Sequence, residues 1–290
     1  MDINVLLNLL GFPPDSKLCI ISCDNLGFAH SFNQAIFDSL RKRTSSCARI
    51  IIGAPWAREV ISQYRGEDIG VALTFISNHP IFRIAPLTQS PTLVDGAGEL
   101  PASRKEFWAH ADTDEVRREC RAQLERAIYY GFDPSHISSE GSALTLRPEF
   151  FDVMLDIALE FNLPIKIPDG VDAGFPANEI AWAEGVISPT NKVIDFDANP
   201  TNSKSIIYAV EEAISNLQTG VSELSFRPSL PSDELNALAG EKADFYVESQ
   251  YLLDSIEFKQ LLMDYSIRII GYRELKFVQS ELADRNESDR

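Results

Sequence analysis

The sequence predicts an α/β fold, more specifically a TIM-like (β/α) barrel in a single domain with a long loop insertion after the third strand. Three observations predict it. Apolar runs alternate with amphipathic stretches along all 290 residues, which is typical of parallel βαβ units. Polar residues follow several of these runs, as in barrels that draw catalytic side chains from many strand ends. No Gly-rich phosphate loop follows the first strand, where a dinucleotide-binding fold needs one.

The predicted strands are short and mostly apolar. They occupy residues 17–23, 49–52, 69–75, 136–140, 165–168, 193–196, 223–226 and 267–270. The predicted helices occupy residues 31–40, a stretch beginning near Pro55, and residues 112–131, 147–161, 203–217 and 255–265. The helix at 112–131 has the clearest pattern, because acidic residues fill its first turn and apolar residues repeat at helical spacing before Gly131.

The long loop insertion is predicted for residues 76–111. This stretch is rich in Pro, Gly and Ser, but its apolar and aromatic residues favour an ordered structure. Residues 1–280 are expected to form one domain, and residues 281–290 a flexible acidic tail.

Composition narrows the classes of partner. The 43 acidic and 26 basic residues give a net charge of −17, which disfavours nucleic acid and anionic membrane surfaces. The first residues show neither a basic segment nor a cleavage site, and no apolar run approaches the roughly 18 residues of a spanning helix. We therefore expect a cytoplasmic protein whose four cysteines are reduced. A homodimer is the default expectation for its assembly.

Two strand ends carry residues that could do chemistry. Asp24 and Asn25 follow the first strand, where they could be catalytic or could organise the turn. His136, Ser138 and Glu140 share one face of a strand, because side chains alternate along it. These three could bind a metal or hold a substrate; alternatively, His136 is a structural group and Glu140 a solvated one. Polar residues near other strand ends are Thr74, Asp169, Asp195, Asp197 and Arg227.

Seven segments together resemble a known family. They are Cys23–Ile36, Gly70–Thr74, Pro86–Asp95, Glu115–His136, Arg147–Phe150, Phe226–Leu235 and Gly271–Leu275. In order and spacing they resemble the YdjC-like (ChbG/HpnK) carbohydrate deacetylase family over nearly the whole chain. The resemblance implies a TIM-like barrel. It also implies a metal-dependent hydrolase that removes an N-acetyl group from small chito-oligosaccharides, in which the metal polarises the amide and a bound water attacks it.

The chain departs from the family's pattern where the metal binds. The family has two adjacent aspartates after the first strand, a catalytic base and a metal ligand, whereas this chain has Asp24 and Asn25. Two histidine ligands of the family are replaced by Ala72 and Glu140. The histidine of the family's His-Pro-Gly segment is Arg227 here.

Other positions of the pattern also bear on a metal. His136 matches the first histidine of the family's His-Leu-Asp-Ser-His segment, and Ser138 replaces its aspartate. Because a catalytic zinc needs about three good protein ligands, we expect no metal cofactor. If a metal binds, Asp24, Asn25 and Glu140 form an oxygen-rich set that would hold Mg²⁺ or Mn²⁺ weakly.

Three functional hypotheses follow. In the first, the chain acts on a small molecule without the metal, with Asp24 and Glu140 as acid and base and Arg227 as an anchor for an anionic or carbonyl group. The expected substrate-binding residues are Asn25, His136, Ser138 and Thr74. In the second, the chain is a pseudoenzyme that binds a sugar-like ligand or a protein partner. In the third, it remains a metal-dependent hydrolase, which requires that four substitutions be tolerated together.

Overall fold

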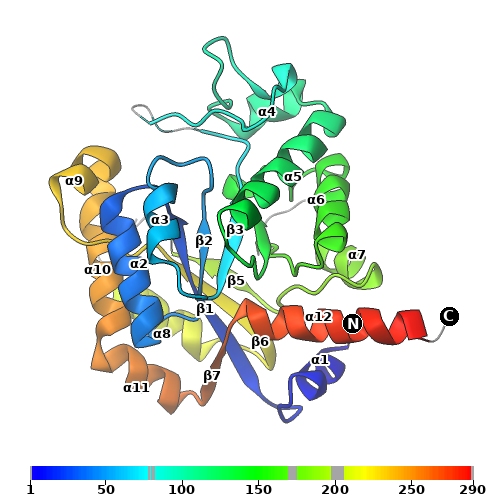
Figure 1. Cartoon of the computed structure of the whole chain (residues 1–290). Helices are drawn as coiled ribbons and strands as arrows, with labels where there is room; N and C mark the ends of the chain where they lie inside the picture. The colour runs from blue at the N-terminus through cyan, green and yellow to red at the C-terminus, as the bar shows by residue number, and fades with distance from the viewer. Residues whose placement is uncertain (1, 78, 80–81, 169–174, 197–205, 289–290) are drawn as a thin grey trace.

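The computed structural model describes residues 2–77, 79, 82–168, 175–196 and 206–288. Its centre is a curved parallel sheet with the strand order β4-β3-β2-β1-β6-β5 (Figure 1). The strands of this path are β1 (Lys17–Leu26), β2 (Cys47–Ile50), β3 (Ile69–Leu73), β4 (Ile137–Ser139), β5 (Val193–Asp195) and β6 (Gly220–Phe226). A further strand, β7 (Ile267–Ile270), pairs in parallel with the first residues of β1.

Beyond β4 the described part of the chain continues the sheet through an isolated bridge. Ile165 forms an isolated parallel bridge with Ile137, and its N–H donates to the carbonyl of Ile187 at 2.9 Å. The strand predicted at 165–168 is therefore reduced to a bridge within the described residues. The sheet is a curled half-barrel, which confirms the parallel α/β class and is compatible with a TIM-like barrel.

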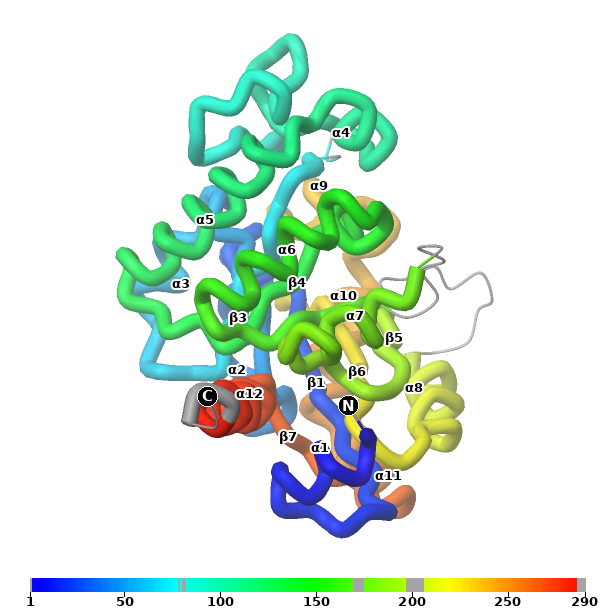
Figure 2. Tube along the Cα trace, turned by 90° about the vertical axis from the view of Figure 1, so that its right-hand side faces the viewer, coloured from blue at the N-terminus to red at the C-terminus, as the bar shows by residue number. Residues whose placement is uncertain are grey.

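Helices surround the sheet, most of them on its outer face (Figures 1 and 2). They are α1 (Ile3–Leu9), α2 (His30–Lys42), α3 (Ala57–Gln63), α4 (Arg104–His110), α5 (Thr113–Tyr129), α6 (Pro148–Glu160), α7 (Ala177–Ala183), α8 (Ile206–Ser215), α9 (Asp233–Ala239), α10 (Ala243–Asp254), α11 (Ile256–Asp264) and α12 (Tyr272–Ser288). Within the described part of the chain, no helix combines the length and the apolar character needed to span a bilayer.

Several helices have no counterpart among the sequence predictions: α1, α4, α7, α9, α10 and α12. α12 extends to Ser288, so most of the expected tail is helical. The start of the helix predicted at 203–217 lies outside the described residues, and α8 covers the rest.

The described residues of the segment 76–111 lie beyond the carboxyl ends of the strands, at the top of Figure 1. It contains α4 and a short 3₁₀ turn at Pro91–Leu93. Glu119 on α5 is fully buried and accepts hydrogen bonds from the backbone N–H groups of Leu87 and Thr88, both at 2.9 Å. This carboxylate fixes the middle of the segment.

Alternation along β1 divides its side chains between two environments. Cys19, Ile21 and Cys23 face the helices and belong to the main hydrophobic core. Leu18 and Ile20 face the other way, into a second apolar cluster inside the curve of the sheet. Because the same alternation continues, the polar side chains that follow them also enter the interior.

Helices α1 and α12 fill the amino-terminal end of this interior. Leu6 and Leu7 of α1 are buried together with Tyr272 and Leu275 of α12, and the two helices lie side by side in Figure 1. The opposite end of the interior, at the carboxyl ends of the strands, is available for a functional site, as is usual in β/α barrels.

Gly70 on β3 makes room for a buried ring. A Cβ atom there would lie 2.5 Å from ring atoms of His136 and 2.6 Å from its carbonyl oxygen. We expect Gly70→Ala to lower the free energy of unfolding by about 3 kcal/mol, because neither a backbone oxygen nor a packed ring can give way. Urea unfolding measures this. Gly96→Ala is the control, since a Cβ there meets nothing within 4 Å. Equal stabilities of the two variants would show that the ring is free to move.

Candidate functional site

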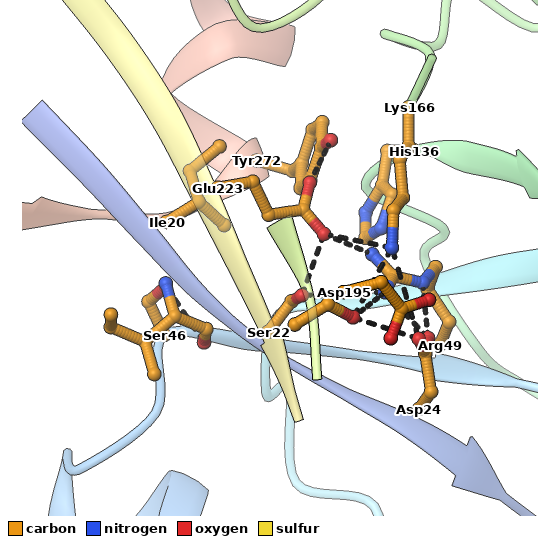
Figure 3. A network of polar contacts seen from close by, with 12 residues as sticks. Ile20, Ser22, Asp24, Ser46, Arg49, His136, Lys166, Asp195, Glu223 and Tyr272 are labelled. Carbon is orange, nitrogen blue, oxygen red and sulfur yellow. Dashed lines mark hydrogen bonds and ion pairs between the residues drawn. The ribbon is translucent and has the colours of Figure 1, made fainter. Parts of the chain in front are cut away.

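A buried network of charged side chains crosses the interior of the sheet (Figure 3). At its centre is Arg49 of β2, whose side chain is only 1% exposed. Its guanidinium group donates to Asp24 Oδ1 at 2.5 Å, to Glu223 Oε1 at 2.7 Å and to the hydroxyl of Ser225 at 2.8 Å. One cation thus joins β1, β2 and β6.

Glu223 is the second carboxylate of the network. Its Oε1 accepts a hydrogen bond from the Ser22 hydroxyl at 2.6 Å, and its Oε2 accepts one from the Tyr272 hydroxyl at 2.6 Å. Lys166 Nζ lies 3.2 Å from Glu223 Oε1 and 3.7 Å from Asp24 Oδ2. Two carboxylates are therefore matched by two buried cations.

The strand register brings these groups together. Ser22 on β1 pairs with Ser225 on β6, so Asp24 and Glu223 enter the interior at adjoining levels. The Ser225 hydroxyl donates to Asp24 Oδ2 at 2.8 Å. Both oxygens of Asp24 therefore have partners within the protein.

The network keeps both carboxylates ionised. Burial alone disfavours the charged form, but Lys166 and Arg49 outweigh it and lower the pKa of Glu223 to about 2. For Asp24, burial is likewise opposed by Arg49, and then by Lys166 and Arg227, so that its pKa is held well below the usual range.

His136 lies deep beside this network. Its ring stacks on Tyr272 with centroids 3.7 Å apart, and Nδ1 lies 2.9 Å from the hydroxyl of Ser135. Nε2 is buried, with no hydrogen-bond partner among the described residues. Burial, reinforced by the charge of Arg49, lowers the pKa of His136, so the ring is neutral.

A cavity of about 260 Å³ opens at the carboxyl ends of the strands. Four residues that the sequence predicted for the site line it: Asn25, Thr74, Glu140 and Arg227. Aromatic side chains supply much of its wall: Phe28, Phe32, Phe82 and Tyr246. Its size is slightly below the roughly 300–1,000 Å³ of sites for drug-sized ligands, so it suits a small molecule.

Arg227 connects the cavity with the network below. Its guanidinium group forks onto Asp195, with nitrogen–oxygen distances of 2.6 and 3.2 Å, and lies 3.8 Å from Asp24 Oδ2. The ion pair with Asp195 fixes the orientation of this cation at the cavity wall.

Glu140 is the acid that lines the cavity. It follows β4 at the start of a 3₁₀ turn and is half-buried. Burial raises its pKa, Arg227 opposes this, and the charge of Asp24 adds to the increase. Glu140 is thus easier to protonate than an ordinary glutamate, whereas Asp24 is harder.

Backbone geometry positions two smaller groups. Asn25 has a left-handed φ of 69° where the β1–β2 ladder is irregular between Cys23 and Leu26, and this brings it to the cavity. Thr74 is held by Gln123, whose Oε1 accepts the Thr74 N–H at 2.9 Å.

The other predicted residues lie outside the cavity wall. Asp24 lies beneath it in the network, and His136 lies deeper against Tyr272. Ser138 is buried on β4 opposite Ala72 of β3 and is not among the lining residues. Asp169 and Asp197 fall outside the described residues.

Sequence reasoning missed four members of the network: Arg49, Lys166, Glu223 and Tyr272. A signal existed for Arg49 and Glu223, since each is a charged residue within an apolar strand. The alternation of side chains along a strand does not by itself predict which face points into the interior. It also does not predict that Arg49 and Glu223 contact each other.

The donor set does not fit the metal that the resemblance implies. Within the described ranges, no three His, Cys, Asp or Glu side chains converge in a way that could hold a metal ion. Ala72 has no donor atom. Asp24 already binds Arg49 and Ser225, with Lys166 nearby.

A curved parallel α/β sheet with a cavity at the carboxyl ends of its strands is compatible with a TIM-like barrel. The sequence profile of the family described as YdjC-like protein matches residues 18–264, so the chain belongs to the YdjC-like family.

Relatives and solved structures agree with this assignment. A carbohydrate deacetylase of Thermus thermophilus is 29% identical over 241 residues, covering 80% of this chain and 86% of the relative. A carbohydrate deacetylase of Thermoanaerobacter pseudethanolicus is 21% identical over 263 residues, covering 90% and 100%. The crystal structure of an Enterococcus faecalis protein assigned to cellobiose-phosphate cleavage has a TM-score of 0.77 at 22% identity, covering 90% of this chain and 99% of that one. This last likeness shows the fold.

Tyr272 offers a direct test of the network. We expect Tyr272→Phe to lower the free energy of unfolding by about 1.5–3 kcal/mol, because it removes a hydrogen bond to a buried carboxylate. Guanidinium unfolding measures the change. Tyr129→Phe is the control, since Tyr129 is 85% exposed. If both variants unfold like the wild type, the hydroxyl does not support Glu223.

The network also predicts how stability depends on pH. Because folding lowers the pKa of Glu223 from 4.5 to about 2, its stabilising effect is complete above about pH 5 and is lost as the pH falls toward 2. We expect the free energy of unfolding to fall over this range, and to fall less steeply in Glu223→Gln. Urea unfolding at pH 7, 5, 4 and 3 measures both slopes. Parallel slopes would contradict the assignment.

Proposed function

We propose that the chain acts on a small polar molecule of the sugar class by proton transfer at Glu140, without a divalent metal. The observation that carries this proposal is the contrast between two carboxyl groups at the strand ends. Glu140 lines the cavity with a raised pKa, whereas Asp24 below it is held ionised by cations. Environments that separate two pKa values in this way are a mark of acid–base sites.

The residues then take distinct roles. Glu140 gives and takes the proton, because it faces the ligand and titrates closer to neutrality. Arg227 orients an anionic or carbonyl group of the ligand, with its own orientation fixed by Asp195. Asn25 and Thr74 offer hydrogen bonds at the wall. Asp24 acts through its charge, since both of its oxygens have partners.

The sugar class rests on two supports. Two relatives that align with 80% and 90% of the chain are named carbohydrate deacetylases. The cavity combines aromatic walls with a few polar groups, which is the usual composition of a site for a small organic ligand. The cavity volume of about 260 Å³ favours one or two sugar units over a long chain.

A second candidate is binding without turnover. It is favoured by the state of Asp24, the aspartate that resembles the family's catalytic base. Arg49 and Ser225 occupy its two oxygens, and its pKa is far below neutrality, so it is a poor acceptor for a proton from water. A metal-dependent hydrolase is the weakest candidate, because no set of metal-donor side chains converges among the residues that the structure describes.

The test uses purified protein in EDTA with N-acetylglucosamine and N,N′-diacetylchitobiose. Calorimetry measures binding, and mass spectrometry of the sugar measures turnover. We expect turnover to survive EDTA and Glu140→Gln to lower kcat by roughly 10²–10⁴-fold, with binding changed only a few-fold. A pH–rate limb above the usual 4.5 of a glutamate should disappear in this variant.

The matched control is Glu149→Gln, which changes an exposed glutamate on α6. Binding without turnover in the wild type would favour the second candidate. Turnover that requires added zinc or manganese would contradict the proposal. Failure to bind either sugar would refute the sugar class.

A further inference from the structure

We propose that Arg49 is a built-in cation that makes this barrel independent of a divalent metal. Its guanidinium group neutralises Asp24 and Glu223 and joins their strands, as a bound metal ion does for clustered carboxylates. The inference concerns the interior beneath the cavity and does not depend on which ligand the cavity takes.

The buried carboxylates require a cation at this position. Asp24 and Glu223 are almost fully buried, and one guanidinium group contacts both, at 2.5 and 2.7 Å. Two like charges this close in a poorly solvated interior repel each other strongly unless a cation lies between them. Arg49 has the position and the charge that this arrangement needs.

Serine hydroxyl groups surround the same two carboxylates. The hydroxyl groups of Ser22 and Ser225 point to the same two carboxylates, at 2.6 and 2.8 Å. Carboxylate and hydroxyl oxygens are the ligands that hard divalent cations take. Without the guanidinium group, this part of the interior would be an oxygen-lined, negatively charged site. The arginine occupies it from within the chain.

The cations around Asp24 would also exclude a divalent metal ion. A metal ion approaching Asp24 would meet Lys166 at 3.7 Å from its Oδ2 and Arg227 at 3.8 Å, besides Arg49. Three fixed positive charges around one carboxylate repel a divalent cation. These three cations therefore disfavour metal binding at Asp24, and they stabilise the strand ends without a metal ion.

Arg49 is also connected to the cavity indirectly. It holds Asp24, and Asp24 faces Arg227, which lines the cavity. Arg49 thus reaches the cavity wall through these two charges, whereas the fork onto Asp195 sets the orientation of Arg227.

The experiment measures metal content and melting temperature together. Wild type and Arg49→Met are dialysed against EDTA and then exposed to 1 mM MnCl₂ or ZnCl₂. We expect the wild type to hold no stoichiometric metal after desalting and to melt at the same temperature in every buffer. Arg49→Met should melt roughly 6–20 °C lower, because two buried carboxylates lose a shared cation. Mn²⁺ or Zn²⁺ should recover part of that loss, and should not do so in Arg49→Met/Asp24→Asn.

Two further variants show whether a lower melting temperature of Arg49→Met comes from the unpaired carboxylates or from a general failure to fold. Arg49→Met/Glu223→Gln removes one charge of each sign and should melt above Arg49→Met in EDTA. Arg121→Met removes a half-buried arginine of α5 that pairs with Glu160, away from the network, and should melt like the wild type. One equivalent of metal in the wild type would overturn the proposal. So would an Arg49→Met protein that melts like the Arg121→Met control, or one that neither metal stabilises.

Discussion

Burying two carboxylates inside a sheet costs several kcal/mol per ion unless cations accompany them, and Arg49 is the cation that Asp24 and Glu223 share. The arginine comes from β2, and its partners come from β1 and β6, the next two strands of the sheet, so one guanidinium group links three strands. Tyr272 donates to Glu223 and stacks on His136, and Arg227 lies 3.8 Å from Asp24, so these side chains adjoin the two carboxylates.

The interior is divided by depth. At the amino-terminal end, Leu18 and Ile20 of β1 pack with α1 and α12 in an apolar plug. Farther along the same strand face, Ser22 and Asp24 begin the charged layer, and above them the cavity opens between Glu140 and Arg227. The cavity therefore lies directly above the buried layer of charged side chains. This layer separates the titration of Glu140 from that of Asp24 and gives the site its proposed chemistry.

Much of the fold could be predicted from local patterns. The apolar runs at 17–23 and 267–270 became β1 and β7, and the capped pattern at 112–131 became α5, because burial period and capping act over a few residues. The run at 165–168 did not become a strand in the described residues, since pairing depends on a neighbour at the right distance. The resemblance to the YdjC-like family was confirmed over residues 18–264.

For the site, the sequence alone determined the inventory of groups. Asn25, Ala72, Glu140 and Arg227 stand where the family's pattern has other residues, and Asn25, Glu140 and Arg227 line one cavity. Only the tertiary structure decided the partners. Asp24 and Arg49 are 25 residues apart, and Asp24 and Ser225 are 201 apart. Contacts over such separations depend on the strand order and register of the folded sheet, which no local pattern encodes. Whether a carboxylate is a free base or a buried counterion depends on those contacts.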